Sequence, residues 1–140
     1  MKAIIRIHGQ VGLKKDIKET LNRLRLRKKY SCVILKESPV IMGMIKKVEN
    51  FVAYGDIDKE TFMELIKKRA KPIDKNKKID FKQIIEEFFE KQNKKLEDLN
   101  AKPFFSLHPP RGGIKTKQKF PKGVLGNHKE KINELIMRML

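Results

Sequence analysis

Basic side chains gather in two short stretches of this 140-residue chain, and phosphate binding is the chemistry they favour. In the first stretch, residues 23–29, three arginines alternate with two leucines and two lysines follow. Guanidinium and ammonium groups bind phosphate, and arginine adds a bidentate geometry. Cations at a helix end also favour the helix dipole, but that effect accounts for one or two charges rather than five. We therefore expect residues 23–29 to bind a polyanion.

The second stretch, residues 108–126, has the sequence HPPRGGIKTKQKFPKGVLG. Its prolines and glycines disfavour regular structure, and its five cations are not accompanied by an acid. Long loops without secondary structure are uncommon in compact domains and are usually functional or disordered. Because apolar side chains such as Ile114 and Phe120 could anchor it, we expect a loop that becomes ordered on its partner.

The net charge of +17 is concentrated towards the two ends of the chain. Residues 1–55 carry 13 Lys/Arg against 4 Asp/Glu, residues 56–98 carry 12 against 11, and residues 99–140 carry 9 against 2. This distribution favours a nucleic acid over a merely soluble lysine-rich surface. A membrane surface is disfavoured, because no predicted helix combines aromatic anchors with a wholly basic opposite face. The candidate binding residues are Lys14, Arg23, Arg25, Arg27, Lys28, Lys29, Lys46, Lys47, His108, Arg111, Lys115, Lys117, Lys119 and Lys122.

Catalytic and metal-binding patterns are not found in the sequence. No nucleophile elbow, zinc-protease helix or phosphate-binding glycine loop is present, although His108 beside Arg111 could act as a general base next to a phosphate clamp. The three histidines lie far from Cys32 and from one another, so we expect no metal and no cofactor. The single cysteine and the lack of a signal or membrane-spanning segment predict a soluble protein of the reducing cytoplasm.

The apolar periodicity of residues 1–56 predicts a β-α-β-α-β unit. Residues 2–8 and 31–37 alternate as strands, and in the first we expect Lys2, Ile4 and Arg6 on the face opposite Ala3 and Ile5. A helix follows each of these strands, and residues 50–54 form a third strand. We expect both helices on one face of a small sheet, which leaves the other face to be covered or to bind a partner. Gly43 lies inside the second helix, where glycine is unfavourable and calls for a reason. Core packing is a better explanation than the close approach of a strand or of a sugar–phosphate backbone.

In the remaining residues, 57–140, the spacing of apolar residues and the candidate caps predict a helical extension with a basic loop and a C-terminal helix. Asp58 and Asp80 are candidate helix caps. Phe81, Phe88 and Phe89 favour core packing over a base-stacking platform, because they recur at helical spacing beside glutamates. Residues 103–107 form a possible extra strand, and Asn127 could cap a last helix that packs on the core. We predict a single domain overall.

Several motifs resemble one family of ribosomal proteins. The segments LRLRKKYSCVILKESP and IMGMIKKVENFV resemble the core of the large-subunit family numbered thirty in bacteria and archaea and seven in eukaryotes. The segments AYGDID, FFSLHPPRGGIK and FPKGVLGNHKEKINELI resemble its longer, archaeal and eukaryotic form. The resemblance implies an α+β fold with a three-stranded antiparallel sheet in the order 3-1-2, distantly ferredoxin-like. It also implies contact with large-subunit ribosomal RNA, without catalysis or a cofactor.

Together, these observations predict a structural constituent of the large ribosomal subunit, located in the cytoplasm on the ribosome. Its expected partners are large-subunit ribosomal RNA and neighbouring ribosomal proteins, with no membrane, no small-molecule substrate and no obligate homo-oligomer. An RNA-binding module of a non-ribosomal ribonucleoprotein is the alternative. A phosphodiester-processing enzyme that uses His108 and Arg111 is a third possibility.

Overall fold

The computed structural model describes residues 1–9, 11–92, 94–111, 113 and 123–140. The strands are β1 (Lys2–Arg6), β2 (Ser31–Leu35), β3 (Val52–Asp56), β4 (Phe105–Ser106) and β5 (Gly126–Lys129). The α-helices are α1 (Lys15–Arg23), α2 (Pro39–Val48), α3 (Lys59–Arg69), α4 (Phe81–Ile84) and α5 (Ile132–Met139). A π-helix, η1 (Ile85–Glu90), continues α4, and a short 3-10 helix, η2 (Glu97–Leu99), follows it.

The α+β class is confirmed, but the expectation of a three-stranded sheet is wrong. The sheet has five strands in the order β4-β2-β1-β3-β5. The three expected strands form its centre, where β1 pairs antiparallel with both β2 and β3. The extension adds β4 antiparallel to β2, and β5 parallel to β3. The sequence GNHK of β5 has no alternation of apolar side chains, so its hydrophobic pattern did not indicate a strand.

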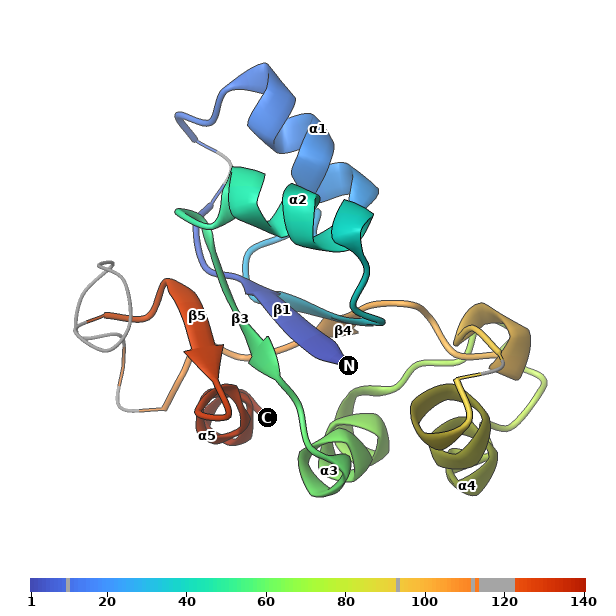
Figure 1. Ribbon diagram of the computed structural model, residues 1–140. Coiled ribbons are helices and arrows are strands. Elements are labelled where there is room, and N and C mark those ends of the chain that lie inside the picture. The colour runs from blue at the N-terminus through green and yellow to red at the C-terminus, as the bar shows by residue number, and fades with distance from the viewer. Residues whose placement is uncertain (10, 93, 112, 114–122) are drawn as a thin grey trace.

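Helices cover both faces of the sheet, so the molecule has three layers (Figure 1). Helices α1 and α2 lie over one face, and α3 and α5 lie over the other. The sheet face that we expected either to be covered or to bind a partner is therefore covered by the extension, residues 57–140. As a result β1 is buried along its whole length, and the expectation that it is only half-buried is wrong. Even Lys2 and Arg6 are buried in β1, and Lys2 forms an ion pair with Asp56 at 2.8 Å.

Two apolar clusters hold these layers together. One cluster packs Ile4 and Val33 of the sheet against Leu21 of α1 and Ile45 of α2. The other packs alternate residues of the same strands against α3, α4 and α5, with Phe62 completely buried. Each buried aliphatic or aromatic side chain contributes about 1.5–3 kcal/mol to folding. The extension is thus joined to the first 56 residues through a shared core.

Most predicted helix starts are found at the expected residues. The side chains of Ser38 and Asp58 cap α2 and α3, and Asp80 caps α4 by accepting a hydrogen bond from Gln83 N–H at 3.2 Å. The expected cap at Asn127 is wrong, because this residue belongs to β5 and α5 begins five residues later. The prediction that the C-terminal helix packs on the core is confirmed by its buried face.

The phenylalanines of the third helical region do not share one environment. Phe88 and Phe89 pack partly buried against the core cluster, in contact with Phe62. The core assignment is wrong for Phe81, which is 38% exposed. The helix changes to a π-helix at Ile85, and this alters the side on which later residues project.

Two glycines lie in contrasting surroundings. A Cβ on Gly55, in β3, would lie 2.3 Å from the carbonyl oxygen of Lys129 and 2.8 Å from Cβ of Ile132. Only glycine therefore allows β5 and the start of α5 to approach β3 so closely. Gly43 in α2 is exposed, and no atom of the described chain beyond the helix's own backbone lies within 4 Å of a Cβ placed there. The expectation that core packing explains Gly43 is wrong.

These surroundings predict opposite effects of the same substitution on the free energy of unfolding. Gly55→Ala should destabilise the protein by about 1–3 kcal/mol through overpacking. Gly43→Ala should stabilise it by about 0.5–1 kcal/mol, because alanine is the better residue in an exposed helix interior. Denaturant unfolding of the two variants checks both signs. A Gly55→Ala variant as stable as the parent chain would contradict this packing.

Candidate nucleic-acid interface

The arginine segment, residues 23–29, begins where α1 ends in a left-handed turn. Leu26 N–H donates to Leu21 O at 2.9 Å and Arg25 N–H donates to Asn22 O at 3.0 Å, the pair of reversed bonds that closes many helix ends. Arg25 has φ +63°, in the left-handed region where glycine is preferred. An arginine thus occupies a backbone position at which it is energetically disfavoured.

Burial alternates along the arginine segment as the sequence predicted. Leu24 and Leu26 are 3% and 0% exposed and pack in the cluster beneath α1. The five cations between and after them are exposed: Arg23, Arg25, Arg27, Lys28 and Lys29. The leucines thus fix the backbone, while the cations project from the surface.

A buried arginine supports this segment from below. The guanidinium of Arg6 donates from Nη1 to Leu26 O at 2.8 Å and from Nε to His8 O at 2.9 Å. Its own carbonyl accepts a hydrogen bond from Tyr30 N–H at 2.7 Å. Burial lowers the pKa of the Arg6 guanidinium, which nevertheless stays charged, as arginine does in proteins. The alternation of residues 2–8 did not indicate this role for Arg6, although an arginine within a strand of isoleucines is an unusual feature of the sequence.

Exposed contacts hold the cations of the arginine segment only weakly. Arg23 pairs with Glu19 one helical turn away at 2.8 Å, and both side chains are more than half exposed. Arg25 pairs with Glu97 of η2, and Lys29 Nζ lies 5.1 Å from the centre of the Tyr30 ring. Exposed ion pairs contribute roughly 0–1 kcal/mol, so a phosphate can compete for these cations at little cost.

The structure separates Lys14, Lys46 and Lys47 from the arginine segment. Lys14 precedes α1, and Lys47 lies in the last turn of α2, where its Nζ is 3.9 Å from Oδ2 of Asp16. They therefore lie at the opposite end of α1, whose nine residues span about 13 Å. All three lysines are exposed and form a second basic group.

His108 and Arg111, in contrast, lie in a stretch that starts beside the arginine segment. Leu107 N–H donates to Tyr30 O at 3.1 Å, so the chain enters His108 directly next to the end of that segment. His108 N–H and Arg111 N–H then donate to carbonyls at the end of α5. The guanidinium of Arg138, which the sequence reasoning missed, donates to Arg111 O at 2.9 and 3.0 Å and to Gly113 O at 2.7 Å.

The basic stretch at residues 108–126 is called the late loop below. Four of its candidate residues lie outside the described residues, so its expected ordering on a partner stays a prediction. They are Lys115, Lys117, Lys119 and Lys122.

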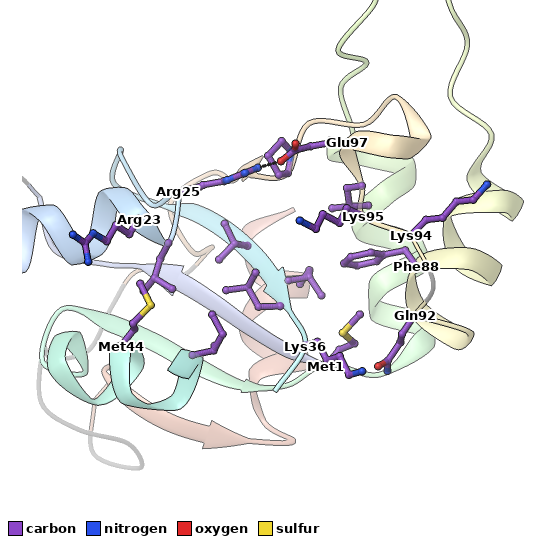
Figure 2. A pocket seen from close by; sticks show the side chains of 17 residues that line it. Met1, Arg23, Arg25, Lys36, Met44, Phe88, Gln92, Lys94, Lys95 and Glu97 are labelled. Atoms are coloured by element: carbon purple, nitrogen blue, oxygen red, sulfur yellow. Dashed lines mark hydrogen bonds and ion pairs between the residues drawn. The ribbon is translucent and has the colours of Figure 1, made fainter. Parts of the chain in front are cut away.

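A basic pocket of about 560 Å³ joins the arginine segment to the extension (Figure 2). Besides Arg23 and Arg25, it is lined by Lys36, Lys94 and Lys95, which the sequence reasoning missed. Residues 94 and 95 lie in the charge-balanced middle of the chain, so their contribution depends on the fold rather than on composition. The pocket is referred to below as the basic pocket.

Two titratable side chains, Cys32 and His128, are buried in the core away from the candidate interface. Burial raises the pKa of the Cys32 thiol to about 12, so this cysteine is an inert core residue. His128 is buried with Nε2 2.6 Å from Val124 O, and burial lowers its pKa. Within the described residues, no three His, Cys, Asp or Glu groups are arranged to hold a metal ion. No helix in the described part of the chain is long and apolar enough to cross a membrane.

Comparison with known proteins identifies the family. The family model for ribosomal protein L30p/L7e matches residues 2–52. This chain is 40% identical to large ribosomal subunit protein uL30 of Archaeoglobus fulgidus. The alignment covers 99% of this chain and 99% of that protein. It is 39% identical to uL30 of Methanococcus vannielii and 37% identical to uL30 of Nanoarchaeum equitans, covering 98% and 97% of those chains. The chain therefore belongs to the L30p/L7e (uL30) family of ribosomal proteins, in its archaeal, longer form.

Proposed function

We propose that this protein is a structural, non-enzymatic constituent of the large ribosomal subunit that binds large-subunit ribosomal RNA. The observation that carries the binding proposal is the arginine segment, whose five cations project while two leucines and Arg6 fix its backbone. Such an arrangement presents charge in a fixed geometry, which lowers the entropic cost of binding a folded RNA. The protein acts in the cytoplasm, on the ribosome, beside neighbouring ribosomal proteins.

The interface has a main region and a smaller one. The main region is the arginine segment together with His108 and Arg111. The arginine segment leads into the first residue of β2, and the stretch that contains His108 and Arg111 begins next to the same end of that strand. The smaller region is the group of Lys14, Lys46 and Lys47 at the far end of α1. Phosphate contacts supply affinity through counterion release, and they position the protein on the RNA without reading its sequence.

We assign different roles to the two parts of this single domain. Residues 1–56 carry most of the proposed RNA contacts. Residues 57–140 cover the second face of the sheet and add the late loop, whose lysines we propose as further RNA ligands. Neither the described residues nor the similarity to uL30 proteins favours a non-ribosomal ribonucleoprotein over this assignment.

Sedimentation of a cell lysate tests the ribosomal role. The protein should migrate with large subunits at about one copy each and remain bound after washing at moderate salt. Finding most of it free at the top of the gradient, under conditions that leave subunits intact, would contradict the proposal.

The salt dependence of RNA binding tests the arginine segment. The test variant replaces four of its cations by alanine: Arg25, Arg27, Lys28 and Lys29. The control variant removes four exposed lysines from α3 and the loop after it: Lys67, Lys68, Lys75 and Lys78. Filter binding to deproteinised large-subunit RNA at several salt concentrations should give the test variant a salt slope smaller by about two to four, since each phosphate contact contributes about 0.7–0.9.

The control variant should keep a slope close to that of the parent chain, because its lysines lie outside the proposed interface. Circular dichroism should show both variants folded. Equal slopes for the test and control variants would assign the binding to net charge alone and contradict the role of the segment.

A second variant separates stability from binding. Arg25→Gly should raise the free energy of unfolding by up to about 1 kcal/mol, because glycine adopts the left-handed conformation without steric cost. The same variant should bind RNA more weakly. Lys129→Gly is the matched control, because Lys129 also has a positive φ, of +51°, but lies in β5. It should gain stability and keep its RNA affinity, and a parallel loss of affinity in both variants would refute the assignment.

A further inference from the structure

The basic pocket combines an apolar floor with a rim of cations. Its floor is apolar, and the buried side chains of Val33 and Leu24 form part of it. Its rim carries five cations: Arg23, Arg25, Lys36, Lys94 and Lys95. Among the described residues that line it, the one acid is Glu97, which is already paired with Arg25. The pocket therefore suits a ligand with an apolar body and several negative charges.

An aromatic ring forms one wall of the pocket. Figure 2 shows Phe88 at the side of the pocket, between Lys94 and Gln92. The Phe88 ring packs at 5.7 Å against Phe62 and is only partly buried, so it is held from the core side. Such a supported ring is a stacking surface for a flat ligand.

The backbone around the pocket is unusual on both sides. Phe88 lies in the π-helix η1, a conformation that is rare and often found at functional sites. Gln92 has φ +54°, and Arg25 across the pocket has φ +63°. Non-glycine residues seldom adopt this region, and such conformations cluster at ligand sites.

We infer that the basic pocket binds one unstacked nucleobase of a single-stranded RNA segment, with the flanking phosphates on its rim of cations. The inference rests on the proposed function and assigns the pocket a contact to a base in addition to those to phosphates. The volume of about 560 Å³ lies within the range of about 300–1,000 Å³ that ligand pockets occupy. Proteins recognise single-stranded RNA by stacking splayed bases on aromatic rings beside basic grooves.

RNA fits this pocket better than an acidic peptide does. Every nucleotide brings a phosphate together with its base, so one unstacked base delivers negative charge to both sides of the pocket. A peptide would need acidic residues on both sides of each apolar anchor to match five cations. Phosphate can also replace Glu97 as the partner of Arg25, because that pair is about half exposed.

The test compares two octamers with the full-length chain. One is a mixed-sequence RNA octamer, and the other is an octamer of abasic ribose-like phosphates with the same charge. Fluorescence anisotropy should show the base-bearing octamer bound about 5- to 100-fold more tightly, at equal salt slopes. Equal affinities would overturn the inference. Binding of a leucine- and aspartate-rich peptide, without any preference for bases, would assign the pocket to a protein and also overturn it.

A pair of neighbouring substitutions localises the effect. Phe88→Leu should remove most of the preference for bases, whereas Phe89→Leu should retain it, because Phe89 stacks on Phe62 at 4.9 Å and does not line the pocket. Equal losses in both variants would refute the role of Phe88. If either variant fails to fold, the two octamers on the parent chain still decide the question.

The same experiments separate this inference from the proposed function. Salt-dependent binding of large-subunit RNA without any preference for the base-bearing octamer would remove the base pocket and leave the ribosomal role intact. Failure to bind large-subunit RNA at all would remove the proposed function itself.

Discussion

The hydrogen bond from the buried Arg6 guanidinium to the carbonyl of Leu26 is the contact on which the candidate interface depends. Together with the buried Leu24 and Leu26, it fixes a loop whose five exposed cations repel one another. A buried carbonyl left without a donor costs about 1–3 kcal/mol, so the arginine and the loop constrain each other. The guanidinium of Arg6 binds carbonyl groups below the segment, whereas the five cations of the segment project from the surface. This division explains why one strand of a ribosomal protein core contains a buried arginine.

The extension changes what the first 56 residues can do. It covers the second face of the sheet with α3 and α5, and it adds a strand at each edge. It also places Lys94 and Lys95 opposite the arginine segment, with the Arg25 to Glu97 ion pair bridging the two parts (Figure 2). The basic pocket exists only because residues distant in sequence meet there. A core without the extension would present the arginine segment alone.

Much of this architecture was predictable from the sequence because local rules determine it. The period of the apolar residues located the central strands and most helices, and Ser38, Asp58 and Asp80 marked helix starts through their side chains. The predictions failed where tertiary contacts decided the outcome. Alternation alone could not show that β1 is covered on both faces, and β5 has no apolar pattern to detect.

The candidate interface, too, was predictable only where the local sequence pattern determines it. The alternation of arginine and leucine indicated correctly which side chains of the segment project. It could not indicate that Arg25 adopts a left-handed conformation, that Arg6 supports the segment, or that Lys36 lines the same pocket as the lysines of the extension. These relations follow from strand pairing and helix termination, which bring together residues whose separation in sequence is large.

The central claim is that the arginine segment faces ribosomal RNA. Ultraviolet crosslinking of assembled large subunits, followed by mapping of the crosslinked peptides, tests this claim most directly. The account predicts crosslinks in peptides that contain residues 23–29 and in those that contain residues 88–95, at higher yield than in peptides from α3. Crosslinks confined to α3, with the arginine segment unmodified, would contradict it.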